Sequence, residues 1–104
     1  MDLDGLGRFA DPAVLILSSL AGGDKHGYAL LRDIEEFAGV RLGPGTLYGA
    51  LTRLEQRGLV QPLAAEQRRR PYRMTEAGTA ALREYLQHAR AVTEIGLFRL
   101  ATDT

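Results

Sequence analysis

The chain has 104 residues, of which 45% are hydrophobic and 25% are charged. This length supports one domain, or a small domain with an appended helix, and the composition excludes a disordered chain. The absence of cysteine excludes disulfides, thiolate zinc sites and cysteine nucleophiles. The start, Met1-Asp2-Leu3-Asp4, is acidic, and the longest apolar run covers only residues 13–17. We therefore expect a cytoplasmic protein with no signal peptide and no membrane contact.

The net charge is zero, but the charges are segregated along the chain. Residues 41–73 hold seven arginines and two glutamates, so this segment carries an excess of five positive charges. The remaining residues carry an equal negative excess. Such segregation allows one face of a neutral molecule to attract phosphates. A cluster of arginines that is simply solvated is the alternative interpretation.

Two helices are predicted in the first third of the chain. Asp11 and Pro12 are typical of a helix start, because Asp caps free amides and Pro fits the first helical position; they begin a helix over 12–21. A second helix is predicted over 25–38, opening at Asp24 or Lys25. Its apolar stripe is expected to consist of Tyr28, Leu31, Ile34 and Phe37.

A turn rich in glycine and proline leads to a third helix, predicted over about 46–57 and capped by Thr46. Leu47, Leu51 and Leu54 follow the spacing of a buried helix face. The pair Gly58-Leu59 is suited to a Schellman-type end.

A two-stranded ribbon is predicted next, with strands over 59–63 and 69–74 and a tip over 64–67. Pro62 and Pro71 cannot donate hydrogen bonds to a neighbouring strand, so both strands should be short or lie at an edge. We expect a ribbon that is not part of a larger sheet.

Thr75 is expected to cap a fourth helix, with Glu76 in its first turn. This helix is long for so small a chain, and a long amphipathic helix without another partner usually pairs with a second subunit. The stripe predicted to form this dimer interface consists of Leu82, Tyr85, Leu86, Ala89, Val92 and Gly96.

The order of these elements predicts a mainly α fold with a small two-stranded β-wing, namely a winged helix-turn-helix with a long C-terminal dimerisation helix. We expect one domain over 1–104, with the DNA-binding part over 12–75 and the dimerisation helix over 76–100. In such a unit the third helix enters the major groove. Its outward face carries the candidate DNA contacts Thr46, Tyr48, Gly49, Thr52 and Arg53.

Gly49 lowers the stability of its helix by about 1 kcal/mol relative to alanine, and close approach to a partner would compensate for this cost. The alternative is that Tyr48 is a half-buried core residue and Gly49 is incidental. Arg68, Arg69 and Arg70 follow the ribbon tip, where arginines bind phosphates or enter a minor groove. A turn that only aids solubility is the alternative there.

The sequence resembles the PadR-like transcriptional regulators, closest to their short members, over about residues 12–90. The matching stretches are Ile16, Leu17 and Leu20, His26-Gly27-Tyr28, Pro44-Gly45-Thr46-Leu47-Tyr48, Leu51-Thr52-Arg53-Leu54-Glu55, Gly58-Leu59-Val60 and residues 68–78. The resemblance implies a winged-helix dimer, joined through the C-terminal helix with help from the first helix, on pseudo-palindromic operator DNA. It implies DNA contacts by Thr46, Tyr48, Arg53, His26, Tyr28 and the three wing arginines Arg68, Arg69 and Arg70.

Two positions depart from the family pattern. Pro71 stands where an aromatic residue is common, which implies a shorter or bent wing. The chain has no tryptophan, so the drug-binding tryptophan sandwich of some members is not expected.

An enzyme is not expected, because the chain has no nucleophile elbow and no candidate carboxylate pair. His26 and His88 are too isolated for a metal site, and no cofactor is predicted. The predicted function is a sequence-specific transcriptional regulator, a repressor, that acts as a homodimer. A winged-helix module that binds another protein is the alternative, and the zero net charge favours it. A small apolar effector that modulates the dimer is a further hypothesis.

Overall fold

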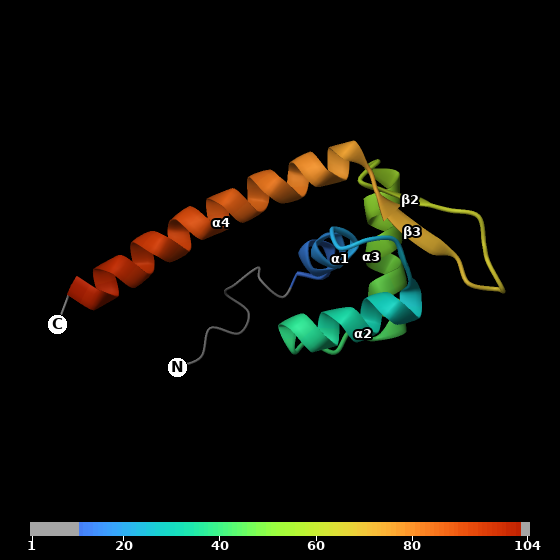
Figure 1. Cartoon of the computed structure of the whole chain (residues 1–104), viewed down its shortest axis with the longest axis horizontal. Coiled ribbons are helices and arrows are strands. Elements are labelled where there is room, and N and C mark those ends of the chain that lie inside the picture. Colours follow the sequence, from blue (N-terminus) through green and yellow to red (C-terminus); the bar gives the residue numbers. More distant parts are fainter. Residues whose placement is uncertain (1–10, 103–104) are drawn as a thin grey trace.

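The computed structural model describes residues 11–102, which form four α-helices and a small antiparallel sheet (Figure 1). The elements are α1 (Pro12–Leu20), β1 (Lys25–His26), α2 (Gly27–Ala38), α3 (Pro44–Gln56), β2 (Val60–Pro62), β3 (Pro71–Met74) and α4 (Glu76–Thr102). The mainly helical fold with a long C-terminal helix confirms the predicted fold class. The acidic start at residues 1–4, on which the expectation of no signal peptide rests, lies outside the described residues.

The sheet contains three strands in the order β1-β3-β2, so the prediction of an isolated two-stranded ribbon is wrong. Strand β1 pairs with β3 through Lys25 opposite Tyr72 and His26 opposite Pro71. A strand of two residues is too short to show an alternating pattern, so no sequence pattern indicated it. Pro71 is the first residue of the central strand, a position where its missing N–H is tolerated.

The core lies around α1, which packs against the other three helices. Asp11 accepts a hydrogen bond from the amide of Ala13 at 2.9 Å, and Pro12 occupies the first turn, so the predicted start of this helix is confirmed. The buried hydrophobic residues of the core are Leu15, Ile16, Leu17, Leu20, Leu30, Ile34, Leu47, Ala50, Leu51, Leu54, Val60 and Leu82.

Helix α2 begins at Gly27, after β1, and not at Asp24 or Lys25 as predicted. The predicted stripe is also wrong at its two ends, because Tyr28 and Phe37 are exposed. Each residue turns an α-helix by about 100°, so residues nine apart lie on opposite sides. The buried face is formed instead by Gly27, Leu30 and Ile34.

Helix α3 begins two residues earlier than predicted, with Pro44 in its first turn and Gly43 as the N-cap. Thr46 therefore lies inside the first turn and is not the cap, because proline is already suited to the first helical position. The predicted end is confirmed. The amide of Leu59 donates to the carbonyl of Leu54 at 2.9 Å, and Gly58 adopts a positive φ of 73°, as in a Schellman motif.

Helix α4 starts on the turn that ends α3. The hydroxyl of Thr75 accepts a hydrogen bond from the amide of Gly78 at 3.0 Å, which confirms its role as a cap. Gly78 is buried, and a Cβ atom there would overlap the carbonyl oxygen of Leu59 and the side chain of Met74. The last part of α4 projects away from the other helices (Figure 1), and residues 90–102 are all exposed.

Replacing Gly78 by alanine is expected to destabilise the fold by about 2–3 kcal/mol, because the added methyl group would push the start of α4 off the turn at Leu59. Gly49→Ala is the matched control within a helix. Its methyl group would meet only the Arg53 side chain at van der Waals distance, so alanine should stabilise α3 by about 1 kcal/mol. Urea denaturation of both variants measures the difference. A Gly78→Ala variant as stable as the wild type would contradict this packing.

Candidate nucleic-acid interface

A hollow of about 250 Å³ lies where the start of α2, the first half of α3 and the wing meet. The wing is defined here as residues 60–74, which hold β2, β3 and the loop between them. The hollow, called the cationic hollow below, is lined by His26, Gly27, Tyr28, Tyr48, Arg68, Arg69, Arg70 and Tyr72. Among the described residues, no aspartate or glutamate contributes to this lining. Its chemistry suits an anion.

Helix α3 enters the hollow through Tyr48, which packs against the first residue of α2. A Cβ atom at Gly27 would overlap the hydroxyl and ring of Tyr48, so only glycine allows this contact. About half of the Tyr48 surface remains exposed. The contact therefore joins the start of α2 to α3 and leaves the tyrosine open to a partner.

Tyr72 of β3 lies half-buried at the base of the hollow. Burial is the main cause that raises the pKa of its hydroxyl, and the nearby Tyr48 acts in the same direction. The hydroxyl therefore keeps its proton at neutral pH and can donate a hydrogen bond.

His26 occupies the junction between β1 and α2. Its Nδ1 atom accepts a hydrogen bond from the amide of Ala29 at 3.3 Å and thereby caps α2. The other ring nitrogen, Nε2, lies 3.4 Å from Nη1 of Arg69 on the wing. His26 thus joins the start of α2 to the wing.

The wing tip is a tight turn in which Glu66 and Arg69 exchange two backbone hydrogen bonds, of 2.7 and 2.8 Å. The two residues between them, Gln67 and Arg68, have φ angles of 48° and 69°. Non-glycine residues rarely adopt this left-handed region, which costs about 1–2 kcal/mol per residue. Strain of this kind concentrates at functional sites.

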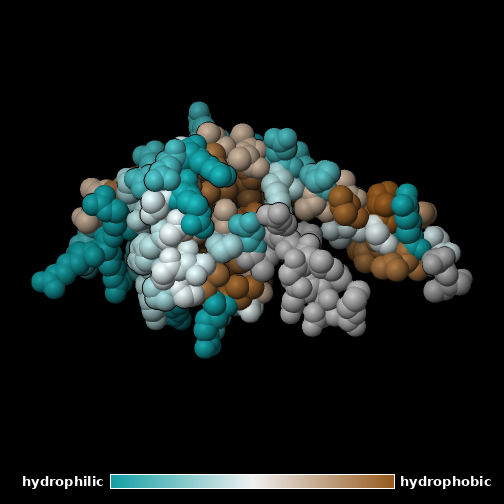
Figure 2. All heavy atoms as spheres, turned by 180° about the vertical axis from the view of Figure 1, so that it is seen from behind, coloured by the Kyte–Doolittle hydropathy of each residue, from teal (hydrophilic) through white to brown (hydrophobic). Residues whose placement is uncertain are grey.

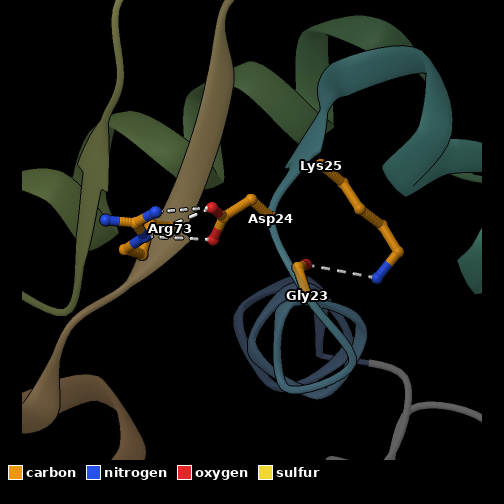
Figure 3. A network of polar contacts seen from close by, with 4 residues as sticks. All are labelled: Gly23, Asp24, Lys25 and Arg73. Carbon is orange, nitrogen blue, oxygen red and sulfur yellow. Dashed lines mark hydrogen bonds and ion pairs between the residues drawn. The ribbon is translucent and has the colours of Figure 1, made fainter.

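Asp24 and Arg73 link the turn after α1 to the central strand (Figure 3). The guanidinium of Arg73 donates to both carboxylate oxygens of Asp24, with distances from 2.9 to 3.2 Å. These hydrogen bonds are the main reason that the pKa of Asp24 is held below its ordinary value. Lys25 points the other way and donates to the carbonyl oxygens of Ser19 and Gly23. The ion pair of Asp24 with Arg73 therefore joins the residue before β1 to β3, close to the hollow.

The wing arginines Arg68, Arg69 and Arg70 differ from Arg73 in their ion pairing. Over residues 11–102, the ion pairs involve Lys25, Arg41, Arg73 and Arg90. Arg68, Arg69 and Arg70 belong to none of these pairs and are exposed. Their charge is therefore not neutralised by the described part of the chain.

A family model described as the transcriptional regulator PadR-like family matches residues 16–84. The chain belongs to the PadR-like family. The match confirms the resemblance drawn from the sequence motifs and identifies the chain as a transcriptional regulator.

Two relatives are similar in sequence to this PadR-like protein. The transcriptional regulator Rv3488 of Mycobacterium tuberculosis (strain ATCC 25618 / H37Rv) is 45% identical over 75 residues, which cover 66% of each chain. An uncharacterized 37.1 kDa protein in transposon TN4556 of Streptomyces fradiae is 51% identical over 75 residues, which are 72% of this chain and 22% of that protein. The chain thus spans less than a quarter of one relative and about two thirds of the other.

Solved structures of transcriptional regulators are similar in fold. A PadR family transcription regulator from hypervirulent Clostridium difficile R20291 matches with a TM-score of 0.77 at 26% identity, covering 90% of this chain and 99% of that one. A transcriptional regulator from Clostridium thermocellum matches with a TM-score of 0.72 at 28% identity, covering 80% and 86%. The long C-terminal helix and the winged-helix fold agree with these structures.

The PadR-like protein gathers six of the ten predicted DNA-contact residues around the cationic hollow: His26, Tyr28, Tyr48, Arg68, Arg69 and Arg70. The other four, Thr46, Gly49, Thr52 and Arg53, lie along α3 outside it. Arg53 borders a separate hollow of about 300 Å³ with Asp11 and Arg57. The hydroxyl of Thr52 donates to the carbonyl of Tyr48 at 2.9 Å, within the helix.

Sequence reasoning missed two residues of the hollow, Gly27 and Tyr72. Gly27 lies in the family motif His26-Gly27-Tyr28, but no local pattern predicts its contact with Tyr48. Tyr72 lay in the predicted returning strand without an assigned role. Over residues 11–102, no group of three or more His, Asp or Glu residues is placed to hold a metal ion. None of the helices in this range is long and apolar enough to cross a membrane.

The ion pair of Asp24 with Arg73 predicts a pH-dependent stability. Because the folded-state pKa of Asp24 is lowered, its contribution is complete above the ordinary carboxyl pKa and is lost as the pH falls through the lowered value. Asp24→Asn is expected to lower the melting temperature slightly at pH 7 and to leave it unchanged in strong acid, as the pair is exposed. In an Arg73→Gln background the same substitution should have no pH-dependent effect. A difference in melting temperature between the wild type and Asp24→Asn that grows toward acid pH would contradict the stabilising role of this ion pair.

Proposed function

We propose that this PadR-like regulator binds duplex DNA in a sequence-specific manner as a homodimer, with α3 in the major groove and the wing on the adjoining backbone. The observation that carries the proposal is the cationic hollow, which joins Tyr48 of α3 to three wing arginines that form no ion pair within residues 11–102. Phosphate contacts fix the register of a protein on DNA, and base contacts specify the sequence. The wing and α3 supply these two kinds of contact.

The outward face of α3 suits the base-reading role. Thr46, Thr52 and Arg53 are exposed and carry hydrogen-bonding groups. Gly49 lies between them and presents no side chain, so the helix backbone can approach the floor of the groove closely. We propose that Arg53 contacts guanine, the commonest specific contact of arginine in the major groove.

The homodimer is proposed from the projecting half of α4. Of the predicted stripe, Leu82 is buried in the core of its own subunit, whereas Leu86 and Val92 are exposed by 44% and 60%. Four further exposed residues, absent from the predicted stripe, follow: Ile95, Leu97, Phe98 and Leu100. Figure 2 shows hydrophobic residues gathered on this end of the molecule.

These distal residues occupy more than one side of the helix. At about 100° per residue, Ile95 and Phe98 lie on roughly the opposite side of α4 from Leu100. Several exposed apolar residues on one helix favour a contact that buries them. A second copy that covers α4 from more than one side would remove this surface from water, and Tyr85, Ala89 and Gly96 would lie within the same contact.

The proposed regulator is a repressor that occupies a pseudo-palindromic operator in the cytoplasm. A small apolar effector is a further proposal, favoured by a hollow of about 260 Å³ at the root of α4. Its lining is Ala21, Met74, Thr79, Leu82, Arg83, Leu86 and Gln87. An effector seated there would contact both the wing strand and α4, and could change the distance between two recognition helices.

Selection of bound fragments from random duplex DNA tests the proposed function. The expected result is an enriched sequence with two-fold symmetry, whose half-sites are one helical turn apart, because a symmetric dimer presents two equivalent recognition helices about 34 Å apart or a multiple of it. Failure to enrich any sequence, together with no binding at low salt, would favour the alternative of a module that binds another protein.

The double variant Arg68→Ala/Arg69→Ala is expected to weaken binding to all duplexes alike. It should also reduce the slope of log affinity against log salt concentration by about 2, since each phosphate contact contributes about 0.9. Fluorescence anisotropy at several salt concentrations measures both quantities. Arg41→Ala is the control, because Arg41 is equally cationic but pairs with Glu35 away from the hollow. A slope that falls equally in the control would contradict the role of the wing.

A further inference from the structure

We propose that His26 and Arg69 together hold a single phosphodiester oxygen of the DNA backbone, with His26 donating from Nε2. This inference rests on the proposed DNA binding and specifies which atoms on α2 and the wing meet the same phosphate. It assigns His26 two simultaneous roles, a helix cap on one ring nitrogen and a phosphate donor on the other.

The cap fixes the proton of the imidazole ring. Nδ1 of His26 accepts the amide hydrogen of Ala29, so in the neutral ring this nitrogen carries no hydrogen. The single proton must then lie on Nε2. The ring therefore presents an N–H donor, and not an acceptor, toward Arg69.

A guanidinium group is also a donor only. Nη1 of Arg69 and Nε2 of His26, 3.4 Å apart, therefore cannot satisfy each other. Two donors at this separation can both reach one oxygen at about 2.8–2.9 Å from each. An anionic oxygen placed between them would satisfy both, and a phosphate oxygen is the acceptor that duplex DNA supplies along its backbone.

The surroundings favour an anion on the side of the cationic hollow. His26 and Arg69 both line that hollow with Arg68 and Arg70, while the acid Glu66 borders a neighbouring hollow that they share. Over the described residues, Glu66 forms no ion pair with Arg69. An incoming phosphate would therefore not have to displace a bound carboxylate.

The backbone brings the two residues close to each other. His26 pairs with Pro71 across the sheet, and Arg69 ends the strained turn two residues before Pro71. The wing and the start of α2 would therefore contact the DNA backbone at the same phosphate.

His26→Asn separates the two roles of the histidine. Asparagine is among the best N-caps, so it should preserve the bond to the Ala29 amide, but it has no donor at the position of Nε2. We expect an unchanged melting temperature, about tenfold weaker DNA binding and an unchanged salt slope, because a neutral donor is lost. His26→Ala is the matched control and should lose stability as well, because it also lacks the cap. Arg69→Ala, at the exposed wing tip, should weaken binding and reduce the slope by about 1.

The decisive measurement replaces single phosphates of the selected duplex by neutral methylphosphonates, one position at a time. The wild type should lose about tenfold at one position per half-site, and both His26→Asn and Arg69→Ala should lose much less there. If His26→Asn and Arg69→Ala lost their sensitivity to methylphosphonate at two different phosphates, the shared contact would be overturned. So would normal binding by His26→Asn, or a ¹⁵N spectrum of the full chain with the proton of His26 on Nδ1. If the wild type bound no duplex, the proposed function itself would fail.

Discussion

The antiparallel pairing of Lys25–His26 with β3 is the contact on which the arrangement of the site depends. Without it, β3 would have a strand partner on one edge only. With it, the wing is fixed to the first turn of α2, where Gly27 also receives Tyr48 of α3. Three segments that are distant in the sequence therefore present one continuous surface, and the ion pair of Asp24 with Arg73 fastens the same junction from the other side.

Charge is used in two ways around this junction. Arg73 is paired with Asp24 and stabilises the sheet, whereas Arg68, Arg69 and Arg70 are exposed and have no ion-pair partner in the described part of the chain. A molecule with zero net charge can thus carry a local positive field, which attracts a polyanion without making the whole surface cationic. The left-handed turn at Gln67 and Arg68 positions these arginines at the end of the wing, although this backbone conformation is unfavourable.

Features with a local cause could be predicted from the sequence. The cap at Asp11, the buried leucines of α3 and the end of that helix at Gly58 each depend on residues within a few positions of one another. Three other features depend on parts of the chain that are distant in the sequence: the pairing of β1 with β3, the contact of Gly27 with Tyr48, and the burial of Leu82. Local sequence patterns therefore do not predict them. A search for a single apolar stripe does not detect the exposed apolar residues at the end of α4, because they occupy more than one side of the helix.

Hydroxyl-radical footprinting on a selected duplex tests most directly whether two copies present this surface together. The proposed dimer predicts two protected stretches on each strand, related by two-fold symmetry and with centres about one helical turn, or a whole multiple of it, apart. Protection should reach the backbone beside each half-site, where the wing would lie. A single protected stretch without symmetry would contradict the paired arrangement of α3 and the wing.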